Sequence, residues 1–433
     1  MVHSILHRVK SEYNSYGRAM RWFIACMMLC SFSVTAEASI TRASANSVFI
    51  TAYTVKYLPL AWLASVPLNL IIVSFYNRFI AQMGCGGMMR LSIILAIGIN
   101  IGCAYCLNAF AFLPFCLYLW KDIFIILMFQ QLWSVIHSTI QMEKAEYLYG
   151  IFFGMGGLGS VAGSLIPGYF ALWVGSERLL LFTIPFYLMT WLFYKLALRI
   201  RSSIDNKQDL SNMNRNNTDI AGGLRLIRHS PFLIFILLIV ISMQVSATIL
   251  DFQFNFLLER SLAIQDLRTQ FLGRFFSVVN TVNVFLQFLG SFFLVRYIGL
   301  KGAHIFVPLL LGAHAIHCLF YPQFIAISVA FATNKAMDYS VFGIIKEMLY
   351  VPLKVEDKFK AKAIIDVFAY RSSKACASLV ILGLSTFAAN HLLEYLTWGV
   401  FILYGCWLTL VLTLFSYYDK AVEERHIYWP CAE

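Results

Sequence analysis

Long apolar runs separated by short polar segments dominate the pattern of this chain. A helix needs about 20 consecutive apolar residues to cross a lipid bilayer. Runs of that length predict an all-α integral membrane protein with twelve transmembrane helices. The twelve runs fall at 19–41, 57–77, 90–109, 113–139, 147–173, 178–199, 231–254, 270–296, 302–320, 322–348, 361–388 and 394–418.

The longest hydrophilic stretch divides these runs into two sets of six. We therefore expect an N-terminal six-helix bundle over 1–200, a cytoplasmic linker over 201–230 and a C-terminal six-helix bundle over 231–433. Two bundles of six spans are the layout of many secondary transporters, whose folds repeat internally.

The first apolar run allows two interpretations. Basic residues precede it, and Ala36-Glu37-Ala38 resembles the cleavage site of a signal peptide. More spans follow at once, and an uncleaved helix gives an even total. We therefore interpret this run as the first transmembrane helix.

Composition agrees with a membrane protein and leaves no room for a sizeable soluble domain. Of 433 residues, 60% are hydrophobic and 13% charged, whereas soluble domains carry about 25% charged residues. The net charge of +11 does not point to nucleic acid, because positive charge in a membrane protein reports topology first. We expect the lipid bilayer as its partner and a monomer as its state.

The distribution of basic residues predicts that both termini are cytoplasmic, in a bacterial inner membrane. Lysine and arginine concentrate in cytoplasmic loops. With the N-terminus inside, the central linker and the loop before the eleventh span are cytoplasmic, and both are basic. The opposite side then holds few basic residues, among them Arg42, Arg178, Arg260 and Arg268.

Several charged residues lie inside or at the edges of the expected spans, where a charge costs roughly 2.5–3.5 kcal/mol at mid-bilayer. So many costly charges indicate a polar path through the bundle, and hence a transporter. They are Glu37, Lys56, Lys121, Asp122, Asp251, Arg274, Lys335, Asp338, Asp366, Arg371 and Lys374.

Arg371 and Lys374 are three residues apart and share one helix face. Either Asp366 and a carboxylate of another helix neutralise them permanently, or a multivalent anionic substrate completes the charge balance. Lys56 is either an interfacial lysine that snorkels or part of the same site. Asp251 is either a partner for one of these cations or a proton site.

The sequence contains no motif for a metal site, for a nucleotide-binding P-loop or for catalysis. The cysteines are scattered and include one CxxC, Cys103 to Cys106, without a second pair, so we expect no metal and no cofactor. No Lys-Ser/Thr follows the glycines of the fifth span, which excludes a P-loop. Their spacing of four, as in Gly159 and Gly163, predicts close helix packing instead. Because no HxxxxD, HExxH or nucleophile elbow occurs either, we expect no enzyme activity.

Several segments resemble the ATP/ADP translocase family, the nucleotide transporters of plastids and obligate intracellular bacteria, which share the major facilitator fold. The segment from Lys360-Ala361-Lys362 through Ile365-Asp366-Val367 to Tyr370-Arg371-Ser372-Ser373-Lys374 is similar to the K-A-x-I-D-V…N-R-x-G-K-S-G stretch of that family. Further segments fit in order, among them Val55-Lys56-Tyr57-Leu58-Pro59-Leu60 and Glu143-Lys144-Ala145-Glu146-Tyr147-Leu148-Tyr149-Gly150-Ile151-Phe152. The G-K-S-G of the family is Ser373-Lys374-Ala375-Cys376 in this chain.

The resemblance implies a major-facilitator-like bundle that moves a nucleotide, or a similar phosphorylated anion, by exchange. The two helix lysines of the family fall on Lys56 and Lys374, and its second acidic residue falls on Asp251. Its first acidic residue falls on Asp122, beside Lys121. In this interpretation Lys56, Arg371 and Lys374 bind phosphate oxygens, and the two aspartates pair with these cations when the site is empty.

Two alternatives stay open at this stage. One is a major facilitator porter for a different solute, such as an amino acid or a drug-like cation. The other is a degenerate paralogue that no longer transports. Loss of the charges inside the membrane would be typical of the second alternative, and this chain largely keeps them.

Overall fold

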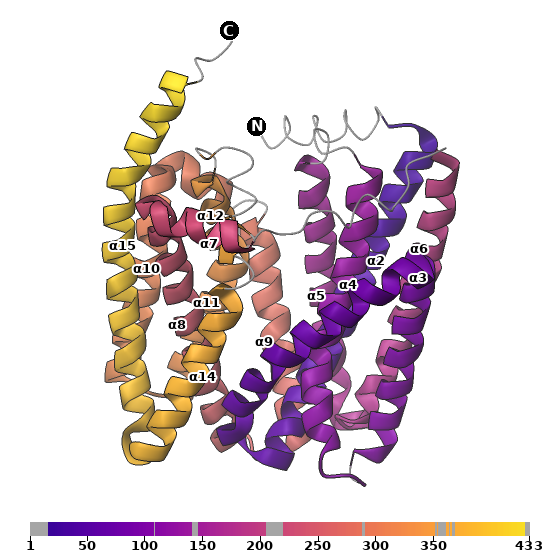
Figure 1. Cartoon of the computed structure of the whole chain (residues 1–433). Helices are drawn as coiled ribbons and strands as arrows, with labels where there is room; N and C mark the ends of the chain where they lie inside the picture. The colour runs from indigo at the N-terminus through magenta and orange to yellow at the C-terminus, as the bar shows by residue number, and fades with distance from the viewer. Residues whose placement is uncertain are drawn as a thin grey trace. The chain divides into compact units, whose positions relative to one another are not determined.

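The protein is all-helical wherever the computed structural model describes it (Figure 1). The described residues are 16–107, 109–140, 146–204, 220–287, 291–350, 353, 361–362, 364–365 and 369–428. Asp366 and most of the linker, residues 205–219, lie outside them.

The helices of the first half are α2 (Arg18–Tyr53), η1 (Val55–Tyr57), α3 (Leu58–Cys106), α4 (Leu113–Thr139), α5 (Glu146–Val174), η3 (Arg178–Thr183) and α6 (Ile184–Ile204). Those of the second half are α7 (Ile220–His229), α8 (Pro231–Ser261), α9 (Gln265–Phe285), α10 (Ser291–Phe320), α11 (Phe324–Met337), the π-helix η6 (Asp338–Phe342), α12 (Gly343–Leu349), α14 (Tyr370–Phe387), η8 (Ala389–His391) and α15 (Leu392–Tyr428).

Within the described residues, nine helical segments are long and apolar enough to cross a membrane. The three other expected spans are also helical where they are described, but they are polar or interrupted. α9 carries Arg268 and Arg274, α11 ends after 14 residues at a π-helix, and α14 carries Arg371 and Lys374. The all-α membrane fold is therefore confirmed, whereas the count of twelve stays a prediction.

The described residues fall into two compact units. Unit 1 lies within 1–52, 67–215 and 263–281, and unit 2 lies within 53–66, 216–262 and 282–433. Residues 53–66 thus pack with the second half of the chain, and residues 263–281 pack with the first half. One unit boundary falls at Pro67 inside α3, where proline removes a backbone hydrogen bond of the helix. The bundles expected at 1–200 and 231–433 stay a prediction.

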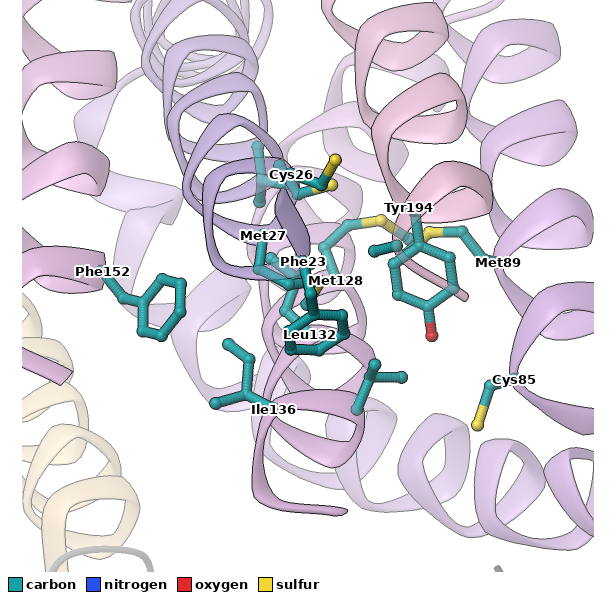
Figure 2. Packing of buried hydrophobic residues seen from close by; sticks show 14 of the residues in the cluster. Phe23, Cys26, Met27, Cys85, Met89, Met128, Leu132, Ile136, Phe152 and Tyr194 are labelled. Atoms are coloured by element: carbon teal, nitrogen blue, oxygen red, sulfur yellow. The ribbon is translucent and has the colours of Figure 1, made fainter. Parts of the chain in front are cut away.

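Helix α2 forms the centre of the core of unit 1. Its Phe23 and Met27 are fully buried and pack with Met89 of α3, Met128 of α4 and Tyr194 of α6 (Figure 2). A helix that is surrounded in this way is apolar or small all round rather than on one face. The sequence of α2 fits this rule, because its buried polar residues are mostly small serines and threonines.

Glycines of α5 let this helix lie directly against α2. A Cβ atom at Gly159 or at Gly163 would lie 2.1 Å from the carbonyl oxygen of Phe32 or of Ala36, respectively. One turn earlier, the Thr35 hydroxyl donates a hydrogen bond of 2.6 Å to the carbonyl of Gly156. The close packing predicted from the glycine spacing is thus confirmed for this pair of helices.

Two glycines with positive φ occupy equivalent turns of the two halves. Gly84 (φ 68°) lies between the second and third apolar runs, and Gly299 (φ 72°) lies between the eighth and ninth. Both interrupt a long helix with non-helical backbone. This region of φ favours glycine, because a Cβ atom there approaches the following carbonyl.

We expect Gly84→Ala and Gly299→Ala each to destabilise the protein by about 1–3 kcal/mol through backbone strain alone, because a positive φ with ψ of 169° or 173° is essentially restricted to glycine. No atom lies within 4 Å of the added Cβ at either site, so collision contributes nothing. Gly98→Ala is the matched control, since that position is helical and equally open. The thermal denaturation midpoints of the purified variants measure the effect. A midpoint for Gly84→Ala as high as that for Gly98→Ala would contradict this prediction.

Candidate anion-binding site

The candidate site of unit 2 is built on η1, α8 and α14. The single turn η1 is tied to α8, because the backbone N–H of Val55 donates a hydrogen bond of 3.3 Å to Oε2 of Glu259. Lys56, the next residue, is exposed. Thr54 before it has a φ of 65°, which is strained for a residue other than glycine. This short turn therefore holds Lys56 at the start of α3.

Arg371 and Lys374 lie in the first two turns of α14, and both are half-buried. The Lys374 Nζ atom lies 5.2 Å from the ring centroid of Trp62, a buried residue near the start of α3. An ammonium group at this distance is attracted by the ring electrons. Lys374 of α14 therefore contacts the same short segment, 53–66, that carries Lys56.

Asp251 lies in α8 and is half-buried. Its Oδ1 atom accepts a hydrogen bond of 2.8 Å from the side-chain amide of Asn255, one turn further along the helix. Among the described residues it has no ion pair. The expected pairing of Asp251 with a cation of the site stays a prediction.

No carboxylate of the described residues pairs with Lys56, Arg371 or Lys374. Asp366, the partner that the sequence suggests, lies outside that part of the chain. Two cations on one helix face repel each other, and a multiply charged anion relieves that repulsion. Because guanidinium and ammonium groups bind phosphate and carboxylate oxygens strongly, this face has the chemistry of an anion site.

Lys121 and Asp122 belong to α4 of unit 1 and form an ion pair with each other. The Lys121 Nζ atom lies 2.8 Å from Oδ1 of Asp122 and 4.1 Å from the ring centroid of Tyr118. The two neighbouring residues thus compensate each other's charge locally. Their expected part in substrate binding stays a prediction.

A buried hydrogen-bond network joins α2, α3 and α6 around Glu37. Its Oε1 atom accepts hydrogen bonds from the hydroxyls of Thr41 (2.6 Å) and Tyr187 (2.7 Å). The side-chain amide of Asn100 donates to Tyr187 and to Thr183, at 2.9 Å each. Sequence reasoning flagged Glu37 as a costly charge but missed the network. Its partners lie up to 150 residues away, and no local pattern marks them.

Sequence reasoning also missed the surroundings of Asp338, in the π-helix η6. The side-chain amide of Gln244 in α8 donates to its two carboxylate oxygens at 3.2 and 3.4 Å. Lys335, one turn earlier, lies over the rings of Phe331 and Tyr339. A π-helix inside a longer helix is frequent at functional sites, so this is a second polar centre of unit 2.

Solved structures of transporters share this fold at very low sequence identity. A bacterial homologue of the iron transporter ferroportin matches with a TM-score of 0.66 and 8% identity, over 90% of this chain and 98% of its own. The nucleoside transporter NupG matches with a TM-score of 0.62 and 12% identity, over 91% and 99%. These neighbours have the major facilitator fold, so the fold expected from the sequence is confirmed.

Curated relatives are carrier proteins of chlamydiae. The ADP,ATP carrier protein 1 of Chlamydia muridarum is 23% identical over 333 residues, 67% of this chain and 62% of the carrier. Its counterpart in Chlamydia pneumoniae is 27% identical over 178 residues, 36% of this chain and 35% of the carrier. This chain thus spans less than two thirds of the length of the relatives it matches.

The family profile described as TLC ATP/ADP transporter matches residues 176–418, which is more than half of the chain. The match includes α8 with Asp251, and α14 with Arg371 and Lys374. The chain therefore belongs to the TLC ATP/ADP transporter family.

Proposed function

We propose that this protein moves a nucleotide, or a similar phosphorylated anion, across a membrane in exchange for another. The observation that carries this proposal is the pair Arg371 and Lys374, which has no carboxylate partner among the described residues. Both residues lie inside the segment that matches the family profile. An anionic substrate would supply the negative charge that no described carboxylate supplies to this pair.

Each residue of the candidate anion-binding site has a distinct part in this proposal. The planar guanidinium group of Arg371 donates hydrogen bonds to two oxygens of one phosphate, whereas Lys374 and Lys56 act as point charges. Tyr53 and Tyr57 flank Lys56, with their ring centroids 6.2 Å apart, and Tyr57 is half exposed. An exposed aromatic ring beside a phosphate-binding lysine suits the stacking of a nucleobase.

Asp251 is a further proposed binding residue of unit 2, and Lys121 and Asp122 are proposed binding residues of unit 1. Asp251 lies on α8, which packs against both η1 and α14. The chain alternates between exposing this site to one side of the membrane and to the other, as is general for transporters of this fold. An uncharged solute would gain no electrostatic attraction from the two neighbouring cations Arg371 and Lys374. We therefore favour a phosphorylated substrate.

We also propose that the membrane is a bacterial inner membrane, with both termini in the cytoplasm. The bias of lysine and arginine toward the loops assigned to that side supports this orientation. The protein acts by transport and catalyses no covalent chemistry.

Transport by purified protein in liposomes tests the proposal. Vesicles loaded with unlabelled ADP are expected to take up labelled ATP, and empty vesicles are expected to take up little, because exchange needs a counter-substrate. Equal uptake by loaded and empty vesicles would replace exchange with uniport or proton-coupled transport. Absence of uptake of ATP, other nucleotides and sugar phosphates would overturn the substrate class.

A further inference from the structure

A cavity of unit 1 is lined by none of the residues of the candidate anion-binding site. It has a volume of about 370 Å³ and lies between α3 and α6. Gly86 lies at its wall, where an added Cβ would come within 3.3 Å of Leu198 of α6. The two helices therefore approach closely beside the cavity, and their packing shapes it.

Three cations line this cavity, and no acidic residue does. They are Arg90 of α3 and Lys195 and Arg199 of α6, and all three are exposed. Within the described part of the chain, none of them forms an ion pair. The Lys195 Nζ atom instead lies 5.0 Å from the ring centroid of Trp191. The cavity thus carries positive charge that no described carboxylate neutralises.

The cavity lies near one end of two membrane spans. Arg90 follows the start of the span Gln82–Cys106 by eight residues, and Lys195 precedes the end of the span Arg178–Ser203 by eight. At 1.5 Å per residue, both lie about 12 Å from a span end. The predicted topology assigns both of these span ends to the cytoplasmic side.

Helix α6 also exposes apolar side chains. Beside Lys195, the side chains of Leu192 and Leu196 are 56% and 40% exposed, and Trp191 is 36% exposed. Tryptophan is enriched where a membrane meets water. A ligand in this cavity therefore meets three cations, and exposed apolar side chains of α6 lie beside Lys195 in the sequence.

We propose that this cavity binds the phosphate headgroup of an anionic phospholipid from the cytoplasmic leaflet. Basic pockets between transmembrane helices on that side bind such headgroups. Arg90 and Arg199 would contact phosphate oxygens, and Lys195 would add a point charge. A zwitterionic lipid fits less well, because the cavity offers no carboxylate for its ammonium group. This inference is independent of the substrate that the protein transports.

Native mass spectrometry of the detergent-solubilised protein tests the proposal directly. The protein is incubated with equimolar phosphatidylglycerol and phosphatidylethanolamine. We expect retention of one phosphatidylglycerol with at least about a tenfold preference, which corresponds to 1.4 kcal/mol. The triple variant Arg90→Gln, Lys195→Gln, Arg199→Gln is expected to lose that preference. Equal retention of the two lipids by the unaltered protein would overturn the proposal.

A charge-matched variant separates the cavity from general surface charge. Arg178→Gln, Arg260→Gln, Lys301→Gln removes three exposed cations elsewhere and is expected to keep the preference. If this control loses the preference as well, overall charge and not the cavity binds the lipid. The single variant Lys195→Gln provides a second test if the triple variant fails to fold, and it is expected to weaken the preference severalfold.

A soluble phosphate compound tests whether the cavity binds a phospholipid or a soluble anion. Phosphatidylglycerol is expected to raise the thermal denaturation midpoint of the protein, and glycerol 3-phosphate at the same concentration is not. Stabilisation by glycerol 3-phosphate that the cavity triple variant abolishes would identify a site for a soluble anion and overturn the lipid assignment.

Discussion

Replacing Lys374 by glutamine is expected to lower the initial rate of nucleotide exchange at subsaturating substrate by about 10- to 100-fold. A hydrogen bond to a charged group contributes about 1.5–3 kcal/mol, and each 1.4 kcal/mol corresponds to a factor of ten. Lys374 has no carboxylate partner among the described residues, so its ammonium group is available to a phosphate. Uptake of labelled ATP into ADP-loaded proteoliposomes measures the effect.

Two variants serve as controls for this experiment. Lys301→Gln removes an exposed cation from α10, also within the family match, and is expected to transport at the unaltered rate. Lys374→Arg keeps the charge but changes its geometry, and is expected to retain part of the activity. Undiminished exchange by Lys374→Gln would remove this residue from the proposed site.

Loss of folding is distinguished from loss of binding by thermal denaturation. Lys374 lies over the buried Trp62, so the substitution also removes a cation–π contact of about 0.5–2 kcal/mol. A small fall in the midpoint without ligand is therefore expected. We expect ATP to raise the midpoint of the unaltered protein and to leave that of Lys374→Gln unchanged.

The apolar runs predicted the existence of the helices better than their ends. The first run was expected over 19–41, yet α2 continues to Tyr53. Ser44 and Ser47 fall in the extension and make it look polar, but both are buried against neighbouring helices. Hydropathy alone cannot distinguish such a buried helical extension from a loop.

The sequence pattern does not predict every break within a helix. The tenth run is apolar enough to predict one helix over 322–348, whereas α11 ends at Met337 and a π-helix follows. A π-helix depends on local backbone geometry and has no periodicity of its own. Gly84 and Gly299 are different, because a glycine between two apolar runs is a recognisable signal for a turn.

The candidate site was predictable in its charges but not in its contacts. Arg371 and Lys374 share a face by their spacing alone. The contact of Lys374 with Trp62 and the tie between Val55 and Glu259 join segments more than 200 residues apart. The sequence gives only one indication of the contact between Trp62 and Lys374, which is that an aromatic residue follows Lys56 closely. Asp251 accepts a hydrogen bond from Asn255 of its own helix, a contact that the sequence pattern does not predict.

The packing of α5 on α2 leads to the largest expected effect on stability. Gly163→Ala is expected to destabilise the protein by about 3 kcal/mol or more, at the upper end of the cost of overpacking a core. The added Cβ would lie 2.1 Å from the carbonyl oxygen and 2.6 Å from the Cα of Ala36. Because these are backbone atoms, no side-chain rotation relieves the collision, and the two helices must separate.

Separation of the helices has a further cost in hydrogen bonds. Ser31 and Thr35 of α2 donate to the carbonyls of Phe152 and Gly156 of α5, at 3.1 and 2.6 Å, and a shift of either helix weakens both bonds. The thermal denaturation midpoint and the yield of monodisperse protein measure the outcome. Gly98→Ala is again the control, because no atom lies within 4 Å of its added Cβ. Equal stability of Gly163→Ala and Gly98→Ala would show that α2 and α5 do not pack this closely.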